Sequence, residues 1–170
     1  MSVSSIRPQN KYLLLLGGNL GDVALTFDKA RRRLASLGTA VRCSRLYASR
    51  PWGFEAENDF RNQVVELHSD LTPQQMLRAT QRIERSLGRT AKTGGHGYES
   101  RPIDIDILFC GDEVVDEPAL VIPHPQLHLR RFTLVPLCEH WAGLRHPLLH
   151  RTLRSLLDIC PDHSEVTVAD

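Results

Sequence analysis

Apolar and polar residues alternate most regularly over residues 102–110, which read Pro-Ile-Asp-Ile-Asp-Ile-Leu-Phe-Cys. A period of two is typical of a β-strand, whose successive side chains point to opposite faces. The three isoleucines therefore share one face, and Asp104 and Asp106 share the other, roughly 7 Å apart along the strand. The segment predicts a strand that is apolar on one face and carries a pair of carboxylates on the other.

Similar patterns predict the elements around this strand. Short apolar or alternating segments indicate strands over residues 12–16, 40–49 and 62–68. Apolar residues at helical spacing indicate helices over residues 23–37 and 72–87. Asp22 suits the start of the first helix and Thr72, followed by proline, that of the second, while Gly38 and Gly88 suit their ends. The glycines of residues 17–21 are expected to break the first strand.

The order strand, helix, strand, strand, helix, strand predicts an α+β fold. It is that of a ferredoxin-like sandwich with a βαββαβ core and helices packed on an antiparallel sheet. A short strand at 113–115, an irregular stretch over 118–125 and helices over 127–140 and 153–159 are expected to follow. The expected organisation is a disordered leader at 1–10, a single domain over 11–160 and a C-terminal tail at 161–170.

Composition narrows the class of protein. The 170 residues are 41% hydrophobic and 24% charged, which is typical of a globular domain with a core. A net charge of +1 argues against a general binder of nucleic acid or membrane surfaces, and no apolar run reaches the ~20 residues that span a bilayer. The cysteines are scattered without a C-x-x-C pair, so we expect reduced thiols in a cytoplasmic protein. We also expect a monomer, because no heptad pattern or obvious interface is visible.

The first candidate site is the carboxylate pair, Asp104 and Asp106. Two carboxylates side by side on an apolar strand favour a bound cation, and Mg²⁺ prefers such hard oxygen ligands. Arg101, just before the pair, would add a cation suited to phosphate. The alternative is a half-exposed edge strand with two solvated carboxylates.

Aromatic and amide residues suggest a second site. Phe60 and Asn62 would offer an aromatic face and an amide edge to a flat heterocycle, and Phe132 is a candidate for a second aromatic wall. For both phenylalanines, ordinary core packing is the alternative.

Further candidates lie on the second helix and the loop after it. Gln81 and Glu84 share a helix face that is ordinarily solvated. The glycine-rich loop has groups typical of a lid over phosphates, with a solvated basic loop as the alternative: Arg89, Lys92, Tyr98 and Arg101.

The segment around His124 is the last candidate. His124 and His128 have a metal-binding spacing, but the intervening Pro125 disfavours the required helix. His124 and Arg130 are better explained as phosphate ligands.

Four segments in order carry a family resemblance: residues 17–21 (Gly-Gly-Asn-Leu-Gly), 60–62 (Phe-Arg-Asn), 101–108 and 123–132. Together they resemble the 6-hydroxymethyl-7,8-dihydropterin pyrophosphokinases of folate synthesis. The resemblance implies that pyrophosphate is transferred from ATP to 6-hydroxymethyl-7,8-dihydropterin and that AMP is released. It also implies two Mg²⁺ ions and small-molecule substrates, with no nucleic-acid or membrane partner.

The resemblance implies roles for single residues as well. The catalytic residues would be Arg89, Arg101, Asp104 and Asp106, of which the two aspartates would hold the metal. The pterin-binding residues would be Ser49, Arg50, Trp52, Phe60, Asn62 and Phe132. The ATP-binding residues would be Gln81, Glu84, Lys92, Tyr98, Arg101, Ile107, Val121, His124 and Arg130.

This sequence departs from the family at Gly18, where serine is usual, and in a longer loop over residues 89–101. Two other functions stay open. Ferredoxin-like sheets also bind RNA, although Asp104 and Asp106 would repel a phosphate backbone. A magnesium-dependent phosphotransferase acting on another heterocycle would share the carboxylate pair.

Overall fold

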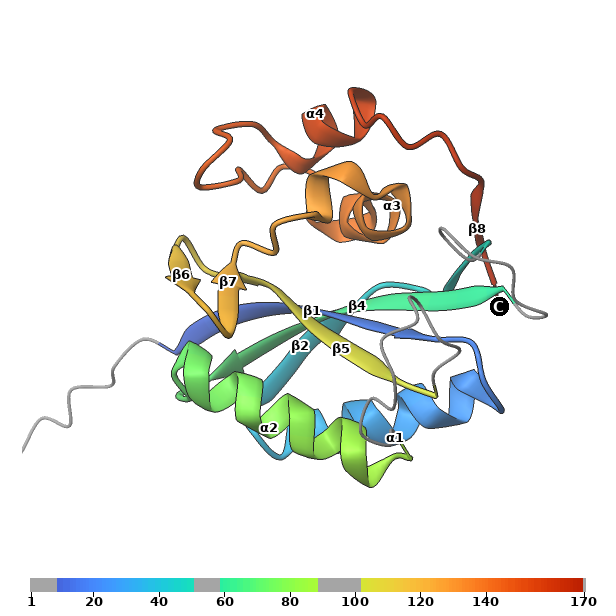
Figure 1. Ribbon diagram of the computed structural model, residues 1–170, viewed down its shortest axis with the longest axis vertical. Coiled ribbons are helices and arrows are strands. Elements are labelled where there is room, and N and C mark those ends of the chain that lie inside the picture. Colours follow the sequence, from blue (N-terminus) through green and yellow to red (C-terminus); the bar gives the residue numbers. More distant parts are fainter. Residues whose placement is uncertain (1–8, 51–58, 89–101, 170) are drawn as a thin grey trace, which may run out of the picture.

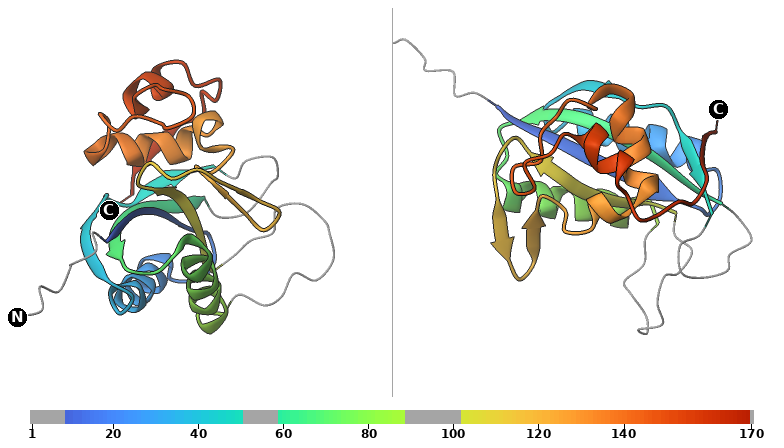
Figure 2. Two further views of the ribbon diagram at one scale, coloured as in Figure 1. Left: turned by 90° about the vertical axis from the view of Figure 1, so that its left-hand side faces the viewer. Right: turned by 90° about the horizontal axis from the view of Figure 1, so that it is seen from above.

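The computed structural model describes residues 9–50, 59–88 and 102–169. A six-stranded antiparallel sheet lies between two layers of helices (Figures 1 and 2). The sheet strands are β1 (Asn10–Gly18), β2 (Thr39–Cys43), β3 (Tyr47–Ser49), β4 (Phe60–Ser69), β5 (Asp104–Cys110) and β8 (Val166–Val168). The helices are α1 (Val23–Ala35), α2 (Pro73–Ser86), α3 (Arg131–His140) and α4 (Leu153–Asp158). A 3₁₀ turn covers Leu127–Leu129, and β6 (Val115–Glu117) pairs with β7 (Leu120–Ile122) in a separate hairpin.

The strand order confirms the predicted ferredoxin-like core. It runs β5-β1-β4-β3-β8. Strands β2 and β3 pair with the same edge of β4, β2 along residues 65–68 and β3 along residues 60–62. The strands of the two βαβ halves are therefore interleaved, as in a split βαβ arrangement. Among the described residues, no helix has the length and apolar character needed to cross a membrane.

Helices α1 and α2 cover one face of the sheet (Figure 1). Phe27 and Leu34 of α1 and Met76 of α2 join the alternating apolar residues of β1, β4 and β5 in one buried cluster. Both helix starts agree with prediction, since Asp22 accepts a hydrogen bond from the Leu25 backbone N–H and Thr72 forms a reciprocal capping box.

Helices α3 and α4 cover the opposite face (Figure 1). Leu134 and Leu137 of α3 and Leu153 and Leu156 of α4 are buried in a second cluster with the intervening residues of the strands. The sheet therefore has an apolar cluster on each face.

Some predictions for the first half of the fold were wrong. Gly17 and Gly18 do not break β1 but pair with Asn62 and Arg61 of β4. The predicted strand over 40–49 is split at Ser44, because the Ser44 hydroxyl accepts the Val64 backbone N–H at 2.9 Å, where a regular strand would offer a carbonyl oxygen.

The end of α1 also differs from prediction. The helix stops at Ala35, before Gly38. Gly38 serves a different purpose, since a β-carbon there would lie 2.0 Å from the His68 carbonyl oxygen. The glycine lets the chain pass close to β4.

The second half of the fold contains more strand than expected. The stretch 118–125, predicted to be irregular, contains β7, whose Leu120 and Ile122 are buried in the first cluster, and the strand expected at 113–115 lies at Val115–Glu117. The expected tail contains β8, which extends the sheet by pairing with β3. Three-residue strands have too little alternation to be seen in the sequence. Of the expected leader, residues 1–8 lie outside the described residues, and Asn10 already pairs in β1.

Candidate active site

Strand β5 presents the carboxylate pair as predicted. Ile103, Ile105 and Ile107 are buried in the cluster beneath α1 and α2. Asp104 and Asp106 alternate with them and are partly exposed, so they lie on the sheet face that α3 and α4 cover farther along. One strand thus serves as part of the core and as the support of two carboxylates.

His124 lies beside this strand. Its backbone N–H donates to the Leu108 carbonyl oxygen of β5 at 3.0 Å. Burial, helped by the positive charge of Arg130, lowers the pKa of His124 to about 4, while the charge of Asp104 opposes the change. His124 is therefore neutral at pH 7, within electrostatic reach of both Asp104 and Arg130.

The tautomer of His124 follows from its neighbour. The Nδ1 atom accepts the Gln126 backbone N–H at 3.2 Å, so the ring proton lies on Nε2. His124 therefore offers one hydrogen-bond donor, which suits a phosphate oxygen better than a metal ion.

Arg130 connects this region to the start of α3. Its guanidinium hydrogen-bonds Gln126 and lies over the Phe132 ring, with its carbon 5.6 Å from the ring centroid. Such a cation–π contact holds the two side chains against each other. Phe132 is partly buried in the first turn of α3 and packs against the second apolar cluster.

Asn62 lies in the same row of the sheet as the first aspartate. Asp104 pairs with Gly17, and Gly17 with Asn62, so the two side chains emerge two strands apart, about 9.5 Å. Asn62 is buried, and its amide nitrogen lies 3.4 Å from the Ser49 hydroxyl oxygen. A β-carbon at position 17 would lie 3.2 Å from Asn62 Oδ1. The glycine makes room for the amide, a contact that the sequence did not predict.

Phe60 begins β4 and alternates in phase with Asn62, so both face the side covered by α3. Phe60 pairs across the ladder with the buried Ser49. The structure thus brings an aromatic ring, an amide and a hydroxyl to the side of the sheet that α3 covers. Arg50 follows β3 and is exposed.

The residues predicted to bind ATP are more widely spread over the structure than those predicted to bind the pterin. Gln81 is exposed and Glu84 buried on α2, which covers the other face of the sheet but contacts β5. Val121 is exposed on β7, whereas the Ile107 side chain points into the core. Any contact of Ile107 with a nucleotide would therefore come from its backbone. Trp52, Arg89, Lys92, Tyr98 and Arg101 lie outside the described residues.

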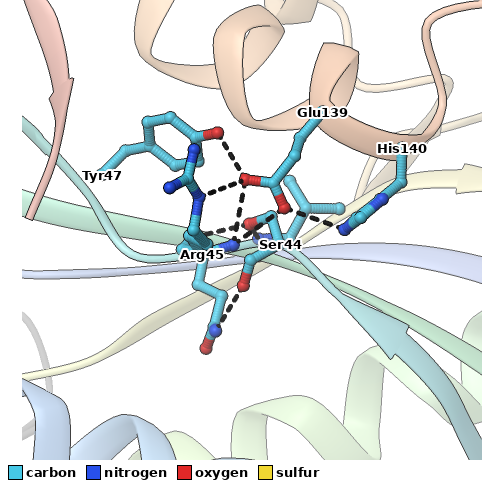
Figure 3. A network of polar contacts seen from close by, with 7 residues as sticks. Ser44, Arg45, Tyr47, Glu139 and His140 are labelled. Carbon is cyan, nitrogen blue, oxygen red and sulfur yellow. Dashed lines mark hydrogen bonds and ion pairs between the residues drawn. The ribbon is translucent and has the colours of Figure 1, made fainter. Parts of the chain in front are cut away.

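Sequence reasoning missed a polar network between α3 and the break between β2 and β3 (Figure 3). Glu139 accepts hydrogen bonds from the Tyr47 hydroxyl at 2.6 Å and from the Arg45 backbone N–H at 3.1 Å. These partners are more than ninety positions away along the chain, so no local pattern could have indicated the contact.

The fold and the site define a ferredoxin-like protein whose sheet carries a carboxylate pair at one edge and an aromatic–amide group beside it. The family model for 7,8-dihydro-6-hydroxymethylpterin-pyrophosphokinase (HPPK) matches residues 13–142, and the chain belongs to this family.

Individual relatives agree with the family match. The chain is 46% identical over 128 residues to a 2-amino-4-hydroxy-6-hydroxymethyldihydropteridine pyrophosphokinase of Porphyromonas gingivalis, covering 74% of this chain and 87% of the relative. A protein of the same name from Aquifex aeolicus is 34% identical over 139 residues, with 82% and 85% covered. The crystal structure of a Plasmodium falciparum HPPK-DHPS has a similar fold at a TM-score of 0.70 and 19% identity, covering 91% of this chain. This chain spans 46% of that larger protein.

Proposed function

We propose that the protein transfers a pyrophosphoryl group from ATP to the hydroxymethyl group of 6-hydroxymethyl-7,8-dihydropterin. The products are AMP and (7,8-dihydropterin-6-yl)methyl diphosphate. The observation that carries the proposal is the carboxylate pair of β5 on the same sheet face as Asn62, in a chain of the pyrophosphokinase family.

The donor set suits magnesium. Asp104 and Asp106 offer partly exposed carboxylate oxygens on one face of a strand, the ligands that Mg²⁺ prefers. Within the described ranges, no third His, Cys, Asp or Glu completes a cluster with them, so substrate phosphates and water would supply the other ligands. Bound magnesium, proposed as two ions, would neutralise phosphate charge and lower the pKa of the attacking hydroxyl.

The pterin is proposed to lie between Phe60 and Phe132. Its edge carries hydrogen-bond donors and acceptors, which the Asn62 amide can pair with, and Ser49 keeps that amide in place. Trp52 and Arg50 are proposed to complete this pocket. Stacking and edge recognition together favour a flat, nitrogen-rich bicycle.

The phosphates of ATP are proposed to lie toward β5. There the Nε2–H of His124 and the guanidinium of Arg130 donate to phosphate oxygens, with Arg89 and Arg101 acting on the transferred group. The nucleotide is proposed to extend toward the remaining predicted ATP-binding residues: Gln81, Glu84, Lys92, Tyr98, Ile107 and Val121.

In the reaction, the pterin hydroxymethyl oxygen attacks the β-phosphorus of ATP. A new bond forms between them, the bond from the β-phosphorus to the bridging α–β oxygen breaks, and AMP leaves with that oxygen. The hydroxyl proton passes to Asp106 or to solvent. Because such transfers depend on positioning and charge neutralisation, the chain's main contributions are the orientation of both substrates and the cations around the phosphates.

The test is AMP release from ATP and Mg²⁺ with dihydropterin, compared with a panel of other heterocyclic alcohols. We expect turnover with the dihydropterin and a loss of at least ~100-fold for Asp106→Ala. Asp112→Ala, which removes an exposed carboxylate just beyond β5, is the control and should retain wild-type turnover.

Three results would contradict the proposal. Near-normal turnover of Asp106→Ala with magnesium present would remove the carboxylate pair from the reaction. Turnover confined to another heterocycle would indicate the rival phosphotransferase. A gel shift with single-stranded RNA, without AMP release, would indicate the rival RNA-binding module.

The proposed state is a monomer in the cytoplasm, with residues 11–160 and the added strand β8 as one domain. Scattered cysteines that are unpaired in the described part of the chain support a reducing compartment. Light scattering on the eluting protein would test the oligomeric state.

A further inference from the structure

We propose that Glu139 is a positioning residue for the pterin pocket. It ties β3 to α3 and thereby sets where Ser49 and Asn62 lie relative to Phe132. The ligand's identity rests on the proposed function, whereas the positioning role rests on the contacts of Glu139 itself.

Glu139 gathers hydrogen bonds from one short segment. The Tyr47 hydroxyl and the Arg45 Nε donate to Oε1 at 2.6 and 3.3 Å, and the Arg45 backbone N–H donates to Oε2 at 3.1 Å. The neighbouring His140 ring lies 2.8 Å from Oε2 (Figure 3). Only 15% of the Glu139 side chain is exposed. Charge-assisted bonds to a carboxylate so shielded from water are the stronger class of hydrogen bond.

The electrostatics agree with a fixed, ionised carboxylate. Burial acts to raise the pKa of Glu139, but the hydrogen bonds from Tyr47 and Arg45 outweigh it and keep the pKa below its ordinary value. Burial, followed by the contact with Glu139, raises the pKa of Tyr47 to about 12. The phenol therefore remains a donor at every physiological pH.

Strand β3 has only three residues, begins just after the break at Ser44 and pairs with β4 and β8. Glu139 adds a contact from α3 to this short strand. Tyr47 pairs with Asn62, and Ser49 pairs with Phe60. The place of β3 therefore decides where the Ser49 hydroxyl meets the Asn62 amide, a contact that is already long at 3.4 Å.

Helix α3 carries both Glu139 and Phe132, the second aromatic residue of the proposed pterin pocket. Glu139 lies in the last turn of α3 and Phe132 in the first. This ten-residue helix is about 15 Å long, and Leu134 and Leu137, on either side of Pro136, are buried in one cluster that fixes both ends of the helix against the same core. A shift of α3 against β3 at Glu139 would therefore also shift Phe132 against Asn62.

A second contact of the same helix provides the control. The Trp141 indole N–H donates to Glu66 Oε1 at 2.7 Å. Glu66 is a carboxylate on β4, four residues from Asn62 and so about 13 Å away. Its described partners are Trp141, which follows the end of α3, and His68, and it does not touch β3 in any described contact.

The experiment compares Glu139→Gln, Tyr47→Phe and Glu66→Gln with the wild type. We measure Kd for 6-hydroxymethylpterin and, separately, for an uncleavable ATP analogue with Mg²⁺. We expect Glu139→Gln and Tyr47→Phe to weaken pterin binding about tenfold, the effect of losing one well-placed hydrogen bond. Binding of the ATP analogue should change less than twofold, and Glu66→Gln should leave both constants within twofold.

Amide hydrogen exchange gives a readout that needs no ligand. Faster exchange in Glu139→Gln at Tyr47–Ser49 and at positions 60–62, absent in Glu66→Gln, is expected. Unchanged exchange there, pterin and nucleotide affinities that fall together, or an equal effect of Glu66→Gln would overturn the positioning role. A wild-type protein that binds no pterin would overturn the proposed function alone, and exchange would then decide the role of Glu139.

Discussion

At the scale of the residue, the surroundings of each side chain decide what it can contribute to phosphate binding. His124 lies within electrostatic reach of Asp104 and of Arg130, and it is neutral at pH 7 while the guanidinium carries a charge. A neutral ring donates a directed hydrogen bond without adding to the positive charge, while Arg130 supplies charge and stacks on Phe132. The two residues can therefore orient and neutralise phosphate separately.

Gly17→Ala tests the close contact beneath Asn62. The added methyl group would lie 3.2 Å from the amide oxygen, so the amide must move by a few tenths of an ångström. We expect pterin binding, followed by fluorescence titration, to weaken about tenfold, or ~1.4 kcal/mol, with thermal stability nearly unchanged.

The matched control for that variant is Gly18→Ser. Position 18 usually carries serine in the family that the sequence resembles, and alternation along β1 places it on the opposite face. Equal losses in the two variants would show that any side chain in this segment disturbs binding, and that the Asn62 contact is not special.

At the scale of the element, the ends of helices are set by few residues. Thr72 and Gln75 cap α2 reciprocally: the Gln75 backbone N–H donates to the Thr72 hydroxyl at 3.2 Å, and the Thr72 N–H donates to the Gln75 side chain at 2.9 Å. Thr152 caps α4 with a single bond, from the Ser155 N–H at 3.1 Å.

Thr72→Ala should lower the free energy of unfolding by about 1 kcal/mol, because it leaves a helix N–H without its acceptor. Urea denaturation of the variant, beside Thr152→Ala, gives the measurement. A smaller loss is expected for Thr152→Ala, and the reverse order would contradict the role of the reciprocal cap.

Elements with strong local signals were predictable. The isoleucine–aspartate alternation located β5 and its two faces, and Asp22 and Thr72 located the helix starts. The break at Ser44 and the strand β8 were not, because each depends on partners distant in sequence. The hairpin containing β7 was missed because its two strands have only three residues each. For the same reason, the sequence indicated Asn62 as a site residue but neither Gly17 beneath it nor Glu139 behind it.

At the scale of the whole molecule, buried titratable groups shape the dependence of stability on pH. His146 is 4% exposed, and its Nδ1 accepts two backbone N–H groups at 3.1 Å. Burial, then the charges of His128 and His150, lower its pKa. At the other extreme, burial raises the pKa of the Cys110 and Cys138 thiols to about 11.

Whether the free energy of unfolding rises or falls with pH depends on which state, folded or unfolded, binds more protons. Below about pH 6.5, the unfolded chain protonates His146 before the folded protein does, so stability is full above that pH and falls as pH drops. Above about pH 8.5, the unfolded chain loses thiol protons that the folded protein keeps, so stability falls again. We therefore expect the free energy of unfolding, from urea titrations at several pH values, to be highest near pH 7–8.

His146→Asn keeps an acceptor for the two N–H groups but cannot titrate. The variant should show a shallower loss of stability between pH 6.5 and 5 than the wild type. His163→Asn, which changes an exposed histidine, should keep the wild-type slope. Identical slopes in all three proteins would exclude His146 as a source of acid sensitivity.

Strand β5 cannot change its length freely. Its isoleucines support the core and its aspartates face the proposed reaction, so a deletion or insertion of one residue would turn the following side chains over unless a bulge absorbed it. Carboxylates would then be buried in the hydrophobic core, and isoleucines would take their places on the exposed face. One extra residue is already absorbed near Leu108, where the pairing of β5 with β1 shifts register. Single residues can therefore be added to or removed from this strand only where such a bulge restores the alternation.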